Sequence, residues 1–246
     1  MVKMTCIGSG SSGNCYLLAA SDGVLIVEAG ISLIEVKKVL RFDISGVVGC
    51  VVTHSHGDHA KYVKDFIASG IRVLALPDVF QSHGIEGLAF RTDIEPRHGY
   101  KVGGFKVYAF SVAHDVPCLG FVIEHQEMGK LLFVTDTMML PYRFGGLNHF
   151  MLECNYSDEI LSYNIENGII PAAMRERLLH SHMEIETTKG ILKANDLGGV
   201  SEVVLIHLSG NNSDADAFCR DIESCCGKPV YAARRGFSIE FGKTAY

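Results

Sequence analysis

The sequence has no apolar run as long as the roughly 18 residues that a membrane-spanning helix needs. Its start, Met1–Thr5, lacks the apolar core of a signal peptide. Eight cysteines are present, but no Cys-X-X-Cys pair occurs among them, so we expect free thiols in a reducing cytoplasm. Internal repeats and low-complexity segments are also absent. We therefore predict a soluble, cytoplasmic protein without a membrane partner.

A basic excess is also missing. The chain has 22 lysine and arginine residues against 28 aspartate and glutamate residues, which gives a formal net charge of −6. Long duplex DNA is bound largely through lysines and arginines that displace counterions from phosphates, so we expect low affinity for long duplex DNA at physiological salt. Arg175 with Arg177, and Arg234 with Arg235, are local basic groups that a solvated face explains equally well.

Three histidines and one aspartate crowd the short segment His54–His59. They directly follow the apolar, β-branched run Gly46–Val52, which predicts a buried strand that ends where the histidines begin. Side chains two apart in an extended loop point the same way, so His54 and His56 can bind one ion while Asp58 and His59 turn toward a second. Clustered histidines with a carboxylate have no packing rationale, and the pattern predicts a metal site.

Three further apolar runs each lead to one residue that can bind a metal. Phe105–Val112 leads to His114, Lys130–Val134 leads to Asp136, and Glu202–Ile206 leads to His207. Composition alone would rarely deliver one such residue near the end of each of three strand-like runs.

The motif His-X-His-X-Asp-His after a buried strand, with these three single residues, resembles the metal-binding signature of the metallo-β-lactamase fold superfamily. The resemblance runs from Ile7–Asn14 to His207–Asn212, and these two end motifs look most like the single-domain YycJ/WalJ-type nuclease branch. Glu153–Tyr156 and Ser181–Met183 are similar to the glutamate and histidine motifs of ribonuclease Z.

This resemblance implies an α/β fold, a four-layer αββα sandwich, in one domain over residues 1–246. The candidate ligands extend from His54 to His207 and must converge on one site, which also favours a single domain. Apolar residues make up 48% of the chain, enough for a sizeable core. Asn164–Gly168 is predicted as a loop that overhangs the site. Amphipathic periodicity and end signals predict helices over Ser32–Leu40, His59–Ser69, Ser157–Tyr163, Pro171–Leu179, Glu184–Ala194 and Asp214–Cys225.

The resemblance also implies two divalent ions. His54, His56 and His114 would hold the first ion, Asp58, His59 and His207 the second, and Asp136 would bridge them. Such a pair lowers the pKa of a water between the ions and clamps a phosphoryl or carbonyl oxygen. Nitrogen-rich ligation favours Zn²⁺, while the carboxylates leave Mn²⁺ open.

Cleavage of a phosphodiester also requires a proton for the leaving alkoxide. In ribonuclease Z-like enzymes a Glu–His pair supplies it, and Glu153 with His182 match those motifs; with the ligand Asp58 they form the predicted catalytic set. A carboxylate on the far ring nitrogen keeps an imidazole protonated and oriented, as general-acid catalysis requires. The alternative is that His182 caps the helix that begins near Glu184.

Three other features are open to more than one interpretation. Glu28 stands where the superfamily usually has aspartate before Ala-Gly, and we expect it to hydrogen-bond to the histidine loop rather than to bind metal. Gly8–Gly13 is either a tight strand connection or a phosphate cradle made of backbone amides. Asp115 either orients His114 or lies in a polar loop.

The leading functional prediction is a dinuclear metal-dependent phosphodiesterase that acts on nucleic acid or nucleotides. An exonuclease like the YycJ/WalJ branch, favoured by Asn211-Asn212, competes with a cyclic-nucleotide phosphodiesterase similar to phage anti-Pycsar enzymes, favoured by the acidic charge. A glyoxalase-II-like thioester hydrolase would use the same metals but has no evident need for His182. A metal-binding or interaction module without activity is disfavoured because every expected ligand is intact. The assembly is left open, with a homodimer as the candidate.

Overall fold

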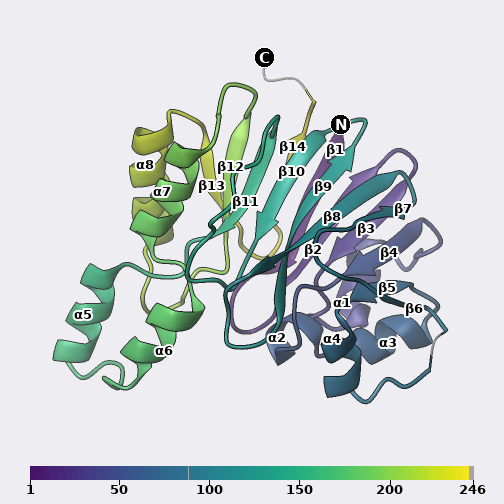
Figure 1. Ribbon diagram of the computed structural model, residues 1–246, viewed down its shortest axis with the longest axis horizontal. Coiled ribbons are helices and arrows are strands. Elements are labelled where there is room, and N and C mark those ends of the chain that lie inside the picture. Colours follow the sequence, from purple (N-terminus) through teal and green to yellow (C-terminus); the bar gives the residue numbers. More distant parts are fainter. Residues whose placement is uncertain (88, 244–246) are drawn as a thin grey trace.

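The first mixed sheet contains seven strands: β1 (Val2–Gly8), β2 (Cys15–Ala20), β3 (Gly23–Val27), β4 (Val47–Val51), β5 (Val73–Ala75), β6 (Arg91–Asp93) and β14 (Ser238–Phe241). Their order in the sheet is β14-β1-β2-β3-β4-β5-β6 in this computed structural model, which describes residues 1–87 and 89–243 (Figure 1). β14, β1, β2 and β3 pair antiparallel, and β4, β5 and β6 extend the sheet in parallel.

The second mixed sheet repeats this plan with β7 (Gly99–Val102), β8 (Phe105–Val112), β9 (Cys118–His125), β10 (Gly129–Val134), β11 (His149–Glu153), β12 (Glu202–Ile206) and β13 (Val230–Ala232). β7 to β10 form an antiparallel meander. β11, β12 and β13 are then added in parallel. In both sheets the parallel strands direct their carboxyl ends to one edge, which is where open α/β sheets commonly bind ligands.

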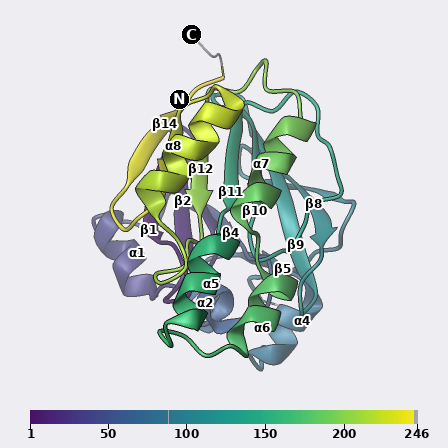
Figure 2. The same cartoon turned by 90° about the vertical axis from the view of Figure 1, so that its left-hand side faces the viewer.

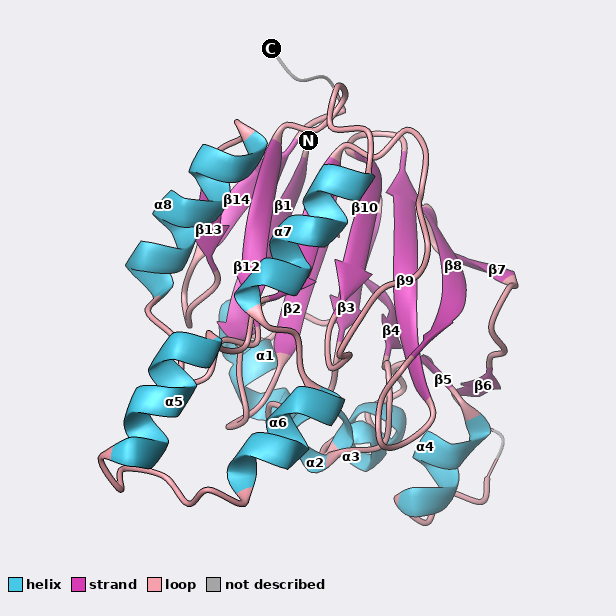
Figure 3. Ribbon diagram, turned by 60° about the vertical axis from the view of Figure 1, so that its left-hand side comes forward, coloured by secondary structure: helices cyan, strands magenta, loops and turns pink. Residues whose placement is uncertain are grey.

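The helices are α1 (Leu33–Val39), α2 (Gly57–Ala60), α3 (Val63–Ala68), α4 (Pro77–Ser82), α5 (Asp158–Glu166), α6 (Met174–Ser181), α7 (Ile185–Ala194) and α8 (Ala215–Cys226). α1, α3 and α4 pack on the outer face of the first sheet, and α7 and α8 pack on the outer face of the second (Figures 2 and 3). α5 and α6 lie beyond one end of the sheets, at the same end as α2 (Figures 1 and 3). The order helices, sheet, sheet, helices is the predicted αββα sandwich.

The largest apolar cluster lies between the two sheets and takes side chains from both, among them Phe105 and Phe121 from the second sheet. β11 and β12 are buried along their whole length because α7 and α8 cover their outer face. Such strands have nearly continuous apolar sequences. β8 instead alternates buried and exposed residues over Phe105–Tyr108, since its outer face there meets solvent.

One predicted helix and one predicted loop differ from the structure. The helix expected over His59–Ser69 is divided into α2 and α3, because the backbone N–H of Tyr62 donates to the carbonyl of Ala29 instead of continuing one helix. The loop expected over Asn164–Gly168 is wrong in its first part, since α5 continues to Glu166. The Asn164 side chain is buried there and donates to the carbonyl of Asn211 at 2.8 Å.

All eight cysteines are unpaired, and five of them are buried. Across residues 1–87 and 89–243, we find no helix with the length and apolar character that a membrane crossing requires.

Candidate metal centre

The carboxyl ends of five strands deliver the candidate residues to one edge of the sandwich. The histidine loop follows β4, and the other residues follow or end strands of the second sheet: His114 after β8, Asp136 after β10, Glu153 at the end of β11 and His207 after β12. His182 comes from the end of α6. All nine predicted site residues gather into three overlapping groups whose ligand atoms lie within 4.8 Å of one another.

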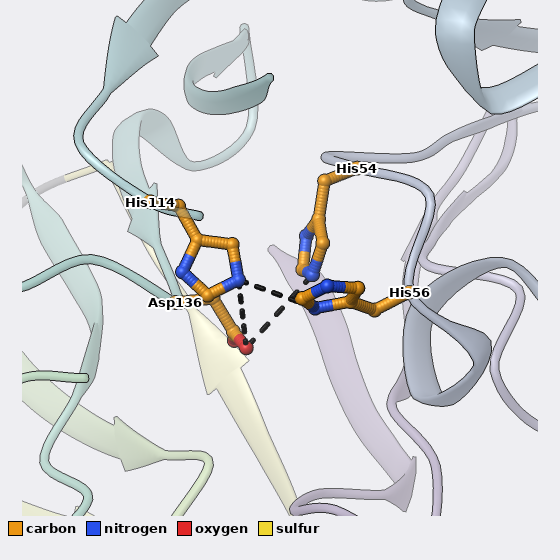
Figure 4. Close-up of side chains that lie close together, drawn as sticks. All are labelled: His54, His56, His114 and Asp136. Carbon is orange, nitrogen blue, oxygen red and sulfur yellow. Dashed lines mark hydrogen bonds and ion pairs between the residues drawn. The ribbon is translucent and has the colours of Figure 1, made fainter. Parts of the chain in front are cut away.

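The first group contains His54, His56, His114 and Asp136 (Figure 4). Nε2 of His114 lies 3.2 Å from Nδ1 of His56 and 4.0 Å from Oδ2 of Asp136. Nε2 of His54 lies 3.9 Å from the same Oδ2. Three imidazoles thus surround one carboxylate oxygen, which is a donor set suited to a divalent transition metal.

The second group contains Asp58, His59, Asp136 and His207. Nε2 of His207 lies 3.2 Å from Oδ2 of Asp58, and Nε2 of His59 lies 3.4 Å from that oxygen. Oδ1 of Asp136 is 3.3 Å from Nε2 of His59 and 3.7 Å from Nε2 of His207. Asp136 therefore presents one carboxylate oxygen to each group, as a bridging ligand would.

Hydrogen bonds behind the first group determine which ring nitrogens face inward. The hydroxyl of Thr53 donates to Oε1 of Glu28 at 2.6 Å, so its oxygen can accept only from Nδ1–H of His54, which lies 2.9 Å away. Nδ1 of His114 likewise donates to the carbonyl of Ser181 at 3.0 Å. These contacts leave Nε2 of His54 and of His114 unprotonated, so that each directs a lone pair toward the group.

Nε2 of His54 is the clearest sign that this cluster suits a cation. The atom is buried and has no hydrogen-bond partner among the described residues. A buried nitrogen acceptor without a partner is costly in a folded protein, and a bound metal ion would satisfy it. The donor set therefore fits the ions that the sequence motif predicts.

Glu28 contacts the histidine loop, as we predicted. Its carboxylate accepts from the hydroxyl and the backbone N–H of Thr53 and lies 3.4 Å from Nδ1 of His59. Glu28, Asp136 and His207 all have positive φ angles, of 71°, 49° and 53°. Non-glycine residues seldom adopt this conformation, and they concentrate at functional sites, where surrounding contacts hold them in place.

The glycine-rich connection between β1 and β2 contacts the histidine loop through hydrogen bonds. Asn14 donates to the carbonyl of Asp58 through its backbone N–H at 2.7 Å. A side chain at Gly30 would begin 1.7 Å from that carbonyl oxygen, so only glycine fits. Ser9 also accepts from the backbone N–H of His207. This connection therefore joins the two halves of the site.

Glu153 and His182 form a close pair beside the second group. Nδ1 of His182 lies 2.6 Å from Oε1 of Glu153, and the other oxygen of Glu153 accepts from the backbone N–H of Thr137 at 3.0 Å. The His182 ring stacks on His207, with centroids 5.3 Å apart and an interplanar angle of 17°. The helix-capping alternative for His182 is wrong, because the side chain of Glu184 caps α7.

The ionisation of these groups follows from their contacts. Burial by itself would raise the pKa of Asp58, but hydrogen bonds from His207 and His59 outweigh it and lower that pKa well below its usual value. Burial would lower the pKa of His182, but the charge and hydrogen bond of Glu153 raise it. The contacts of Asp58 thus favour its anionic form, and the contact with Glu153 favours the protonated form of the His182 imidazole.

A cavity of about 180 Å³ opens onto the cluster. Besides predicted residues, it is lined by Ser11, Ser181 and Arg177, and sequence reasoning missed all three as site residues. Arg177 lies on α6, five positions before His182, and this proximity in sequence is the signal that could have identified it as a site residue. The neighbouring Arg175 is engaged elsewhere, with Asp158 and the hydroxyl of Ser162.

Asp115 is half exposed at the mouth of this cavity, with Oδ1 3.0 Å from Nε2 of His114. It does not orient His114 through Nδ1, since Ser181 occupies that nitrogen. The remaining histidines lie outside the three groups; they are His83, His98, His125, His149 and His180.

The amino-acid sequence resembles known proteins over most of its length. A model of the metallo-beta-lactamase superfamily matches residues 8–142, just over half of the chain. The exodeoxyribonuclease YycJ of Bacillus anthracis is 27% identical over 229 residues, covering 84% of this chain and 82% of that protein. The exodeoxyribonuclease WalJ of Streptococcus pneumoniae is 24% identical over 230 residues, covering 86% of this chain and 83% of that protein.

Solved structures share the fold at lower sequence identity. The metallo-beta-lactamase fold protein YhfI from Bacillus subtilis superposes with a TM-score of 0.74 at 16% identity, over 97% of this chain and 98% of that one. The short form of human tRNase Z superposes with a TM-score of 0.65 at 14% identity, over 97% and 99% of the two chains. At these identities the likeness concerns the fold alone.

Proposed function

The chain belongs to the metallo-beta-lactamase superfamily, and on this premise we propose that it is a dinuclear metal-dependent phosphodiesterase that acts on nucleic acid or nucleotides. The observation that carries the proposal is the pair of Glu153 and His182, 2.6 Å apart and beside the metal cluster. Hydrolysis of a thioester needs no proton donor for its thiolate leaving group, whereas an alkoxide does. The similarity to two exodeoxyribonucleases supports the same substrate class.

We assign one ion to the group of His54, His56 and His114 and a second to the group of Asp58, His59 and His207, with Asp136 shared. Zn²⁺ suits the imidazole-rich donors better than the harder alkaline-earth ions. When bound, such ions lower the pKa of a coordinated water and neutralise charge on phosphoryl oxygens.

In this proposal His182 is the general acid. Glu153 occupies Nδ1, so Nε2 is the ring nitrogen available to substrate in the cavity that His182 lines. The proton on Nε2 would pass to the leaving alkoxide as its bond to phosphorus breaks. Glu153 holds the ring in place and stabilises its cationic form, and Thr137 fixes the second oxygen of Glu153.

A substrate panel tests the proposed function. The metal-loaded protein should hydrolyse bis-p-nitrophenyl phosphate and at least one natural phosphodiester among single-stranded oligonucleotides, duplexes and cyclic mononucleotides. A thioester such as S-lactoylglutathione should remain intact. Rapid thioester hydrolysis with every phosphodiester inert would reverse this assignment and favour the glyoxalase-II-like alternative.

Arg177 should contact a non-bridging oxygen of the substrate, because it lines the cavity and forms no ion pair within 4.0 Å among the described residues. Losing one charge-assisted hydrogen bond costs about 1.5–3 kcal/mol, so Arg177→Ala should lower kcat/KM for phosphodiesters about 10- to 150-fold. Arg175→Ala is the matched control on the same helix, and its kcat/KM should stay near the wild-type value. Equal losses in both variants would assign Arg177 a structural role.

A further inference from the structure

The outer face of the second sheet is covered unevenly. α7 and α8 pack over β10 to β13, while none of the described helices covers β7, β8 and β9 (Figure 3). A cavity of about 680 Å³ lies on this open part and is separate from the metal cluster. We call it the outer groove; its lining includes Lys106, Tyr108, Glu124, Lys130, Arg143 and Phe144.

The strand register places three lysines and one glutamate in a row across the outer groove. Lys101 is directly opposite Lys106, Lys106 is opposite Glu124, and Glu124 is opposite Lys130. Arg143 adds a fourth cation to the lining. None of the four forms an ion pair within 4.0 Å among the described residues. A chain with a net charge of −6 thus concentrates unpaired positive charge on one face.

One pair in this row is unfavourable without a ligand, whereas Lys106 and Lys130 each stand opposite Glu124. Like charges directly opposite on neighbouring strands destabilise a sheet, and Lys101 and Lys106 stand in that relation. Lys38 and Lys189 differ in this respect, since each lies within ion-pair distance of a carboxylate. An anionic ligand with several charges would offset the repulsion between Lys101 and Lys106 and would also meet Lys130 and Arg143.

Aromatic side chains accompany the positive charge. Tyr108 is 41% exposed, and its neighbour on β7 is Gly99, so no side chain shields the ring from that side. Phe144 also lines the groove and packs against Phe110, with centroids 4.8 Å apart. Cationic side chains beside exposed rings are the usual surface for single-stranded nucleic acid, whose phosphates pair with lysines while its bases stack on the rings.

The outer groove and the metal cluster are connected along the chain. β8 carries Tyr108 and leads to His114, six residues or roughly 20 Å further on. The segment that leaves the cluster at Asp136 returns over the sheet to Phe144, and the exposed Tyr142 between them packs edge-on against Phe110. One extended single strand of nucleic acid could therefore run along the sheet from the outer groove to the metal cluster.

We propose that the outer groove binds single-stranded nucleic acid and holds the part of a polynucleotide substrate that lies away from the scissile bond. The inference rests on the proposed phosphodiesterase function for its choice of occupant. It narrows the substrate class to single strands of several nucleotides, and it agrees with the expected low affinity for long duplex DNA, in which the bases cannot reach the aromatic rings.

Binding is measured first, with cleavage suppressed. Fluorescence polarisation of the metal-loaded full chain uses an oligothymidylate of about 12 nucleotides, a length within the range that single-strand surfaces occupy. Phosphorothioate linkages slow its hydrolysis. Lys106→Gln/Lys130→Gln should weaken binding and reduce the salt slope by about 1.4, which is 0.7 for each phosphate contact to a single strand. Tyr108→Ala should weaken it about 5- to 150-fold through loss of one stacked base, and Tyr108→Phe should restore it.

The control double variant Lys37→Gln/Lys38→Gln makes the same change in net charge on α1, which packs on the outer face of the first sheet, and it should bind like the wild type. Binding that is unchanged in the groove variants, or equally reduced in the control, would overturn the proposal. Equal affinity for a duplex of the same length, or for polyglutamate, would contradict a single-strand site as well.

Catalysis separates this inference from the proposed function. In the groove variants KM for the 12-nucleotide substrate should rise at constant kcat, while hydrolysis of bis-p-nitrophenyl phosphate stays unchanged. If the wild type hydrolyses small phosphodiesters but binds no oligothymidylate, the groove proposal fails and the proposed function stands. If it binds oligothymidylate through Lys106 and Lys130 but hydrolyses no phosphodiester, the groove stands and the proposed function fails.

Discussion

Asp136→Ala should reduce phosphodiester turnover more than about 10³-fold and should lower the metal content from about two ions per chain. Asp136 is the only residue shared by all three groups of metal-competent side chains among the described residues, and each of its oxygens faces a different group. Its removal therefore disturbs both ions. Elemental analysis after dialysis and a substrate assay check the two effects together.

Thermal unfolding provides a readout independent of activity. Because metal-binding free energy adds to the stability of the folded chain, a chelator should lower the Tm of the wild type and have little effect on that of Asp136→Ala. Glu28→Gln, which alters a contact behind the ligands, should lose only about 10- to 100-fold in metal affinity or activity. Asp216→Ala removes one exposed carboxylate on α8 and should resemble the wild type. Full metal content in Asp136→Ala would show that the bridging assignment is wrong.

His182→Ala should reduce turnover of substrates with a poor alkoxide leaving group by about 10²–10⁴-fold, the usual contribution of general acid catalysis. Bis-p-nitrophenyl phosphate releases a phenolate that scarcely needs a proton, so its hydrolysis should fall much less. Metal content should remain at the wild-type value, because we assign His182 to neither ion. Parallel assays on a dinucleotide and on bis-p-nitrophenyl phosphate measure this difference.

His180→Ala is the matched control, since it removes an exposed histidine two residues away. Glu153→Gln should show the leaving-group dependence more mildly, because the imidazole remains. It should also lower metal affinity, since Oε1 of Glu153 lies 3.3 Å from Nδ1 of His207 as well as against His182. Equal losses of His182→Ala on both substrates, or loss of an ion, would make His182 a ligand or a structural residue.

The amino-acid sequence by itself determined the local parts of this protein. A short apolar run such as Gly46–Val52 predicts a buried strand, and the polar residue that follows it must then lie at that strand's end, so His114, Asp136 and His207 could be placed from local pattern and the family resemblance. Ser157 and Asp214 were likewise found at helix starts, where their side chains cap α5 and α8. Such features depend on neighbours a few residues away, which a pattern contains.

Only the tertiary structure decided how these parts face one another. Three features of the site join segments that lie far apart in the sequence. Asp136 is shared by two groups, Glu153 contacts both His182 and His207, and Arg177 lines the cavity. Asn164 lies inside α5, and its side chain contacts Asn211, which is 47 residues away in the sequence. The alignment of Lys101, Lys106 and Lys130 across β7 to β10 depends on strand register, because a shift of one residue would turn Lys106 from the outer face into the core. Sheet order and register arise from packing of the whole chain, and no local pattern encodes them.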